Sequence, residues 1–263
     1  MASSFPVQDF YLEAAAGGIP GISVVNKFGA APDGVQTTAT DIWPLANSTP
    51  TQQIWLAPTA ARTHAIVSSS TDDDGSPVGV GARTIRIWGL KTWALAETSE
   101  DITLDGTTPV NTANSYVIIH RMKVLTSGAT SINVGTIKAT AATDTTISCQ
   151  ILPGNGQTQM AIYGIPSIQT LYMTNFWGAI AKAGGAVVTM NMDLRINENP
   201  DVQTTNYIRK HSLALQSTGV GFVDFHFGPY LKVPGPAIIK LQAIGSTADI
   251  DAQAGFDGFL KTN

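Results

Sequence analysis

The stretch Ala186–Asn197, AVVTMNMDLRIN, decides the fold class of this chain. Every second residue in it is apolar: Val188, Met190, Met192, Leu194 and Ile196. Most of the residues between them are polar. A period of two places the two sets on opposite faces of an extended strand. The stretch therefore predicts a β-strand with one dry and one wet face.

The same alternation extends in both directions from this strand. Leu171–Lys182 is another aromatic, β-rich run, and Ala183-Gly184-Gly185 separates the two with glycines that tolerate positive φ. We expect an antiparallel hairpin here. From Gln53 onward, similar runs alternate with turn formers, and no helical period lies between them. A parallel α/β sheet is therefore excluded in favour of an all-β chain.

The turn formers also suggest how the chain is divided. The densest run, Pro153–Gln157, lies near the middle, with a similar number of expected strands on either side. We predict an all-β fold of two β-sandwich, jelly-roll-like domains, at residues 22–153 and 154–263, after a short N-terminal arm at 1–21. The loop at 30–50 is expected to be long and anchored by Trp43.

The composition favours a subunit that packs against other proteins. Charged residues make up 13% of the 263 residues, about half of the roughly 25% usual in soluble domains. A surface of neutral polar side chains repels itself weakly and suits assembly. The net charge of −4 argues against direct nucleic-acid binding, which needs a basic face.

The ends and the apolar runs predict a chain outside membranes. Met1–Phe5 lacks the basic and apolar regions of a signal peptide. No apolar run reaches the roughly 18–20 residues that span a bilayer. We expect synthesis in a host cytoplasm and no membrane partner. The single cysteine, Cys149, lies in an apolar strand and is expected to be a buried, inert thiol.

No motif in the sequence predicts catalysis or a cofactor. The chain has no nucleophile elbow, phosphate-binding loop, zinc-binding helix or dinucleotide fingerprint. Asp224 and His226 share a strand face, and a cross-strand polar pair is expected there rather than a metal or acid–base site. The candidates for a cation are Asp72, Asp73 and Asp74, but their spacing is not that of a calcium loop, and a solvated turn is the preferred interpretation.

Exposed aromatic and apolar side chains are the candidate interface residues. They are Phe5, Phe10, Tyr11 and Leu12 in the N-terminal arm, and Trp88 and Trp93 in the first expected domain. Trp88 alternates with Ile85 and Ile87, which places it on the face away from the core. An exposed tryptophan indicates a ligand platform or a subunit contact, and the low charge favours the contact. Whether the arm packs on a neighbour or on its own domain stays open.

Four segments of the sequence resemble those of a family of tailed-bacteriophage virion proteins, and together they span about Val25–Thr174. They are Asn26-Lys27-Phe28-Gly29 with Pro32-Asp33 and Asp41-Ile42-Trp43; Gly81-Ala82-Arg83-Thr84-Ile85 leading to Ile102-Thr103-Leu104-Asp105-Gly106-Thr107-Thr108-Pro109-Val110; Asn133-Val134-Gly135-Thr136-Ile137; and Pro153-Gly154-Asn155-Gly156-Gln157. The resemblance implies a non-enzymatic component of the particle, with no catalytic or ligand residues to carry over.

These observations lead to one expected function and three alternatives. We expect a virion structural protein that decorates or cements the capsid as a homo-oligomer, most plausibly a trimer, in contact with the major capsid protein. A tail, baseplate or head–tail attachment subunit is the first alternative. A host-glycan-binding module that uses Trp88 or Trp93 is the second. The third, a polysaccharide hydrolase, would need converging carboxylates such as Asp193 and Asp224.

Overall fold

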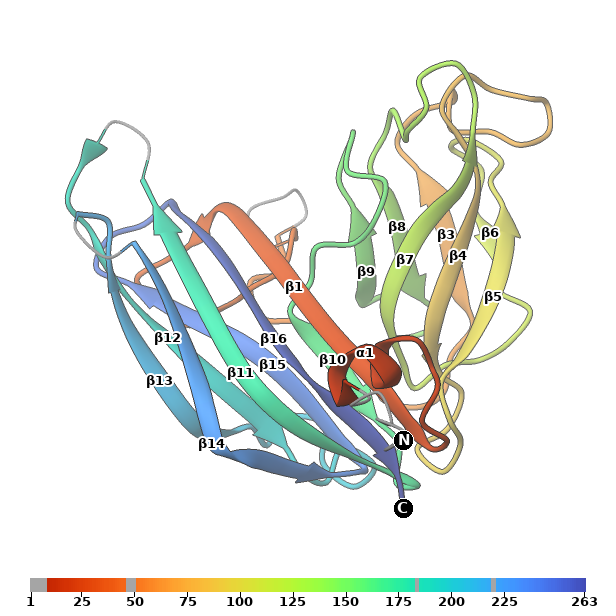
Figure 1. Cartoon of the computed structure of the whole chain (residues 1–263). Helices are drawn as coiled ribbons and strands as arrows, with labels where there is room; N and C mark the ends of the chain where they lie inside the picture. Colours follow the sequence, from red (N-terminus) through yellow and green to blue (C-terminus); the bar gives the residue numbers. More distant parts are fainter. Residues whose placement is uncertain (1–8, 46–50, 183–184, 219–220) are drawn as a thin grey trace, which may run out of the picture.

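The computed structural model describes residues 9–45, 51–182, 185–218 and 221–263, and it consists of two β-sandwiches side by side (Figure 1). The prediction of an all-β chain is confirmed. The helix found in the described residues is α1 (Phe10–Ala15), which Asp9 caps by accepting from the Tyr11 N–H at 2.9 Å. No helix in this part of the chain is long and apolar enough to cross a membrane.

The larger sandwich is a jelly roll. One sheet has the order β1-β16-β11-β14 and the other β10-β15-β12-β13, with β2 added beside β15. From β10 onward, successive strands lie in alternating sheets except for β12 and β13, which pair with each other, and this order is that of paired Greek keys, which defines the fold. The strands are β1 (Ile22–Val35), β2 (Thr40–Asp41), β10 (Ile162–Ile165), β11 (Gln169–Ala181), β12 (Thr189–Asn197), β13 (Ile208–Gln216), β14 (Phe222–Pro234), β15 (Ala237–Gly245) and β16 (Ile250–Thr262).

The smaller sandwich is inserted into the jelly roll between β2 and β10. Its two antiparallel sheets have the orders β6-β3-β8-β9 and β5-β4-β7. The strands are β3 (His64–Ser68), β4 (Ala82–Leu90), β5 (Thr98–Thr103), β6 (Val110–Asn111), β7 (Ile118–Ser127), β8 (Ile137–Ala141) and β9 (Ile147–Ile151). We call it the inserted sandwich.

The sheet pairing groups the chain differently from the predicted division at 153/154. β1 pairs with β16 from Ile22 opposite Lys261 to Val35 opposite Ile250, so the start of the chain completes the jelly roll. β1 also extends to Val35, where the sequence predicts a loop from residue 30. The pairing with β16 is interrupted by a bulge between Ala31 and Val35, at Pro32, Asp33 and Gly34, whose β propensity is low, and it resumes at Val35.

The predicted hairpin between β11 and β12 is wrong. The two strands lie in different sheets: β11 pairs with β14 and β16, while β12 pairs with β13 and β15. Residues 183–184 of the predicted turn lie outside the described residues, and Gly185 has the expected positive φ of 71°. Alternation identifies the buried face of a strand but not the strand beside it.

The dry face predicted for this strand is confirmed, because its five alternating side chains, Val188, Met190, Met192, Leu194 and Ile196, are at most 2% exposed. On its other face, Thr189 and Asn191 are exposed but Asp193 and Asn197 are buried. That end of the face is therefore covered by other parts of the chain.

One cluster of buried apolar side chains runs through both sandwiches and joins them. At the joint, a Cβ on Gly164 of β10 would lie 2.9 Å from Ile118 of β7 and 3.4 Å from Leu90 of β4. Backbone bonds add to the joint, including the one that the Ser167 N–H donates to Trp93 O at 2.7 Å. The two sandwiches are thus packed against each other at this end.

Candidate functional site

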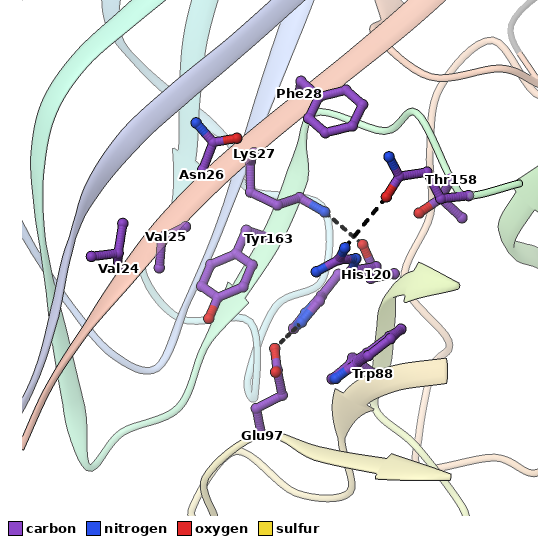
Figure 2. Close-up of a pocket in the computed structure, with 12 residues that line it drawn as sticks. Val24, Val25, Asn26, Lys27, Phe28, Trp88, Glu97, His120, Thr158 and Tyr163 are labelled. Atoms are coloured by element: carbon purple, nitrogen blue, oxygen red, sulfur yellow. Dashed lines mark hydrogen bonds and ion pairs between the residues drawn. The ribbon is translucent and has the colours of Figure 1, made fainter. Parts of the chain in front are cut away.

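A pocket of about 370 Å³ lies where the edge strand β1 of the jelly roll faces the inserted sandwich (Figure 2). β1 contributes one wall, and β4, β7 and the segment after β4 contribute the other. Its polar and aromatic lining residues are Asn26, Lys27, Phe28, Trp88, Glu97, His120, Arg121, Gln157, Thr158 and Tyr163. Both sandwiches are needed to form this pocket.

Lys27 connects the two walls. Its ammonium Nζ donates to the His120 carbonyl oxygen at 2.6 Å, across the joint. Burial lowers the pKa of Lys27 from its ordinary value of 10.5 to about 8. The strand alternation explains its position, because Val25 and Gly29, two residues away on either side, are buried on the same face.

His120 is held by three groups at once. Its Nε2 lies 2.5 Å from Glu97 Oε2, its Nδ1 accepts from the Gly164 N–H at 3.5 Å, and its ring lies on that of Tyr163 with centroids 4.5 Å apart. Burial lowers the pKa of His120. A neutral ring with its proton on Nε2 fits all three contacts. Burial by itself would raise the pKa of Glu97, but the pairing with His120 and the nearby charges of Lys27 and Arg121 outweigh it and lower the pKa, so Glu97 remains ionised.

Trp88 is half-buried in the pocket wall, on the face opposite the buried Ile85 and Ile87 as predicted. Two guanidinium groups lie near its ring, Arg121 at 4.9 Å from the centroid and Arg86 at 5.9 Å. Arg121 also donates to Gln157 at 3.3 Å. A sugar that stacks on this ring would have to compete with these cations.

Titratable side chains therefore converge here, but they are engaged with one another. Both ring nitrogens of His120 have protein partners, and the Lys27 ammonium donates to a backbone oxygen. A general base needs a free lone pair within reach of a substrate proton. The contacts of Lys27 and His120 hold the two sandwiches together, and the pocket beside them has room for a small polar molecule.

The Lys27 contact predicts a specific pH dependence of stability. In the folded chain its pKa is about 8 and in the unfolded chain about 10.5. Between these values the unfolded chain binds more protons, so this residue makes the free energy of unfolding rise with pH. We expect the wild-type protein to gain stability relative to Lys27→Met from pH 8 to pH 10.5, measured by urea unfolding. The exposed Lys123→Met is the control, and a difference that stays constant with pH would contradict the assignment.

The structure separates the other predicted interface residues. Phe10, Tyr11 and Leu12 lie in α1 and are 44%, 59% and 65% exposed. The helix packs on its own domain, with the Phe10 ring 5.0 Å from that of Phe259 on β16. Phe5 lies outside the described residues. Their role in an interface stays a prediction.

Trp93 is half-buried at a different place from Trp88. It lines a pocket of about 330 Å³ beneath the inserted sandwich, together with Val117 and the loop at Pro200 and Val202. The sequence predicts a strand at 93–97, but the structure has a turn there. Asp224 and His226 pair with each other along β14, with Nε2 and Oδ2 3.2 Å apart, and the predicted cross-strand contact is made by Asp224, which accepts from the Asn175 amide of β11 at 3.0 Å.

The triple-aspartate loop is organised by hydrogen bonds to Asp73, in place of the solvated turn preferred from the sequence. Asp73 is fully buried and accepts from Ser68 Oγ at 2.6 Å, from the N–H of Gly135 at 2.7 Å, and from the N–H groups of Ala82 and Val134 at 2.8 Å each. Asp72 is exposed. Four donors around one carboxylate are unfavourable to a cation, and in the described part of the chain no three His, Cys, Asp or Glu side chains are grouped as a metal site.

The sequence analysis did not identify Lys27, Glu97 or His120 as site residues. The only signal in the sequence is that Lys27 occupies an inward position between apolar neighbours in a predicted strand. Glu97 and His120 come from segments far from Lys27 along the chain. Only the packing of the two sandwiches brings the three together.

No family model matches this chain, and no curated protein matches it in sequence. Among solved structures, that of the infectious bursal disease virus Gt strain is 8% identical, with 96% of this chain and 77% of that chain covered and a TM-score of 0.19. The crystal structure of the infectious bursal disease virus VP2 subviral particle is 9% identical, covers 93% and 72%, and has a TM-score of 0.21. At TM-scores this low the likeness shows neither a shared fold nor a shared function.

Proposed function

We propose that this chain is a virion structural protein of a tailed bacteriophage that decorates or cements the capsid through protein–protein contacts. The observation that carries the proposal is a jelly roll with a filled interior and a second sandwich attached to its edge. Among its largest buried side chains are Phe176 and Phe256. Because side chains fill its interior, such a domain interacts with other molecules through its surface. Jelly rolls serve as capsid domains and also as lectins and cupins, so the fold alone supports the proposal only by analogy.

The surface supports contacts with other proteins. Few side chains are charged, 13% of the whole sequence, which reduces the cost of bringing copies together. An apolar cluster lies on the outside of the jelly roll, and we call it the aromatic patch: Phe10, Tyr11, Leu12 and Tyr230. Tyr230 is 45% exposed, and its hydroxyl lies 3.3 Å from that of Tyr11. Exposed apolar patches of this kind often mark interaction sites.

The proposal places the aromatic patch in the contact between copies of a homo-oligomer, most plausibly a trimer. The double variant Tyr11→Ser/Leu12→Ser should shift the protein from oligomer to monomer without unfolding it, because both side chains are more than half exposed. Light scattering after size-exclusion chromatography measures the change. The control is Val202→Ser, since Val202 is 85% exposed and lines the pocket beside Trp93 and Val117 instead of contributing to the patch.

The same proteins test attachment to the particle. Wild-type protein and Val202→Ser should rebind particles that lack this chain, and the double variant should rebind them poorly, because avidity from several weak sites is lost with the oligomer. A wild-type protein that stays monomeric and fails to rebind would contradict the proposal. The number of copies per particle then separates a capsid position from a tail, baseplate or head–tail position.

A further inference from the structure

A third pocket, of about 200 Å³, lies on the outer face of the jelly-roll sheet that contains β12 and β15. Its lining residues are Ile54, Trp55, Leu56, Arg195, Thr205, Tyr207, Lys240 and Gln242. The segment 54–56 forms an apolar wall, and the remaining residues form a polar wall with two cationic groups. No carboxylate is among the lining residues. We call it the basic pocket.

Two hydrogen-bond donors in the basic pocket have no partner. Arg195 Nε and the Tyr207 hydroxyl are both buried, and neither forms a hydrogen bond within the part of the chain that the structure describes. A buried polar group without a partner costs roughly 1–3 kcal/mol, so such groups are rare unless water or a ligand satisfies them. Burial raises the pKa of Tyr207, which keeps its hydroxyl protonated as a donor.

The charges around the pocket favour an anion. Asp193 Oδ2 accepts from Arg195 at 3.0 Å and from Arg209 at 2.9 Å, and Lys240 pairs with Asp41 at 2.7 Å. Arg195 and Lys240 line the pocket, while Arg209 and the two carboxylates lie around it, so the cationic groups outnumber the carboxylates by one. Lys240 Nζ also lies 4.1 Å from the centre of the Tyr207 ring, which fixes that ring in the pocket wall.

We propose that the basic pocket binds a carboxylate carried on a short apolar chain. Both donors are covered by neighbouring side chains, which have to shift for the carboxylate to accept from Arg195 Nε and from the Tyr207 hydroxyl. The apolar chain lies along Ile54 and Leu56. The volume of about 200 Å³ fits a group of this size and exceeds the roughly 30 Å³ share of one water molecule. The carboxylate belongs either to a free small acid or to a glutamate side chain of a protein partner.

Isothermal titration calorimetry of the full chain tests the proposal with three probes at equal ionic strength. Propionate represents the free acid, N-acetylglutamate N-methylamide represents the protein side chain, and propionamide is the uncharged control. We expect propionate to bind one-to-one, in the millimolar range because the contact is small, and propionamide not to bind. Binding of propionate alone indicates a free acid, and binding of both carboxylates indicates a site that also accepts a protein side chain.

Three variants locate the site. Tyr207→Phe removes the unpaired hydroxyl but keeps the ring beside Lys240, and it should weaken propionate binding roughly tenfold. Arg195→Lys keeps the charge but removes the Nε–H and should weaken binding to a similar extent. Arg209→Lys is the matched control, because Arg209 contacts the same Asp193 without lining the pocket. No heat beyond that of chloride, meaning a pocket that holds water only, or unchanged binding by both pocket variants, would overturn the proposal.

Discussion

Replacing Lys240 with methionine should lower the free energy of unfolding by about 3–5 kcal/mol, the usual cost of leaving one charge of a buried pair without its partner. Lys240 is 2% exposed and Asp41 is fully buried, and their atoms are 2.7 Å apart. The remaining bonds to Asp41, from the Gln242 amide at 2.8 Å and the Trp55 N–H at 2.8 Å, cannot neutralise its charge. Urea unfolding followed by tryptophan fluorescence measures the loss.

The double variant Asp41→Asn/Lys240→Met measures the interaction between these two residues apart from their contacts with other groups. Because it removes both charges, it should lose less stability than the sum of the two single variants. Lys232→Met is the control, since Lys232 lies on the exposed strand β14, and it should change stability by less than about 0.5 kcal/mol. Additive single losses, or a Lys240→Met protein within 1 kcal/mol of wild type (roughly the average effect of a point mutation), would contradict the role of this pair.

Replacing Asp73 with asparagine should destabilise the inserted sandwich by about 3–5 kcal/mol. An amide has only one acceptor oxygen, so its NH₂ group would face either the N–H groups of Ala82 and Val134 or the N–H of Gly135 and the Ser68 hydroxyl, which can turn to accept. One or two buried N–H groups therefore lose their partner, at roughly 1–3 kcal/mol each, and the remaining bonds lose the charge of the carboxylate. These donors lie in three separate segments, at Ser68, at Ala82 and at Val134–Gly135. Their connection through one side chain holds the loops at this end together. Thermal and urea unfolding measure the effect.

Asp72→Asn is the matched control, because Asp72 is the exposed neighbour in the same loop. It should change stability by less than about 0.5 kcal/mol. Added calcium should leave the wild-type unfolding temperature unchanged. A rise with calcium that Asp73→Asn abolishes would show that the loop binds a cation and would contradict the structural role assigned to Asp73.

The sequence predicted what depends on periodicity. The alternation in Ala186–Asn197 identified a strand and its buried face, and the same reasoning placed Trp88 outside the core. The burial of Cys149 followed from its apolar neighbours. Each of these predictions requires only local geometry, since side chains two residues apart share a face of a strand.

The sequence did not predict what depends on pairing between distant strands. The pairing of β1 with β16 joins the two ends of the chain, and it explains why the residues before the inserted sandwich belong to the jelly roll. The predicted hairpin failed for the same reason, because a glycine turn is compatible with a crossing between sheets as well as with a hairpin. No local pattern distinguishes these two outcomes.

The candidate sites depend on the same long-range pairing. Lys27 meets His120 only because β1 lies beside the inserted sandwich. The basic pocket combines residues from β12 and β15 with the segment 54–56, which precedes the inserted sandwich. A charged residue on the wet face of a strand, such as Arg195, is ordinary in sequence. Arg195 becomes a candidate ligand-binding residue because the fold brings the segment 54–56 and Tyr207 beside it.

The central proposal is that this chain acts by contact within a virus particle, and its most direct test is an electron cryomicroscopy map of the particle to which the proposal assigns it. The account predicts two-lobed density in many symmetry-related copies, with the jelly roll and its aromatic patch in contact with neighbouring subunits. A purified, complete particle that contains no copy of this chain would contradict it.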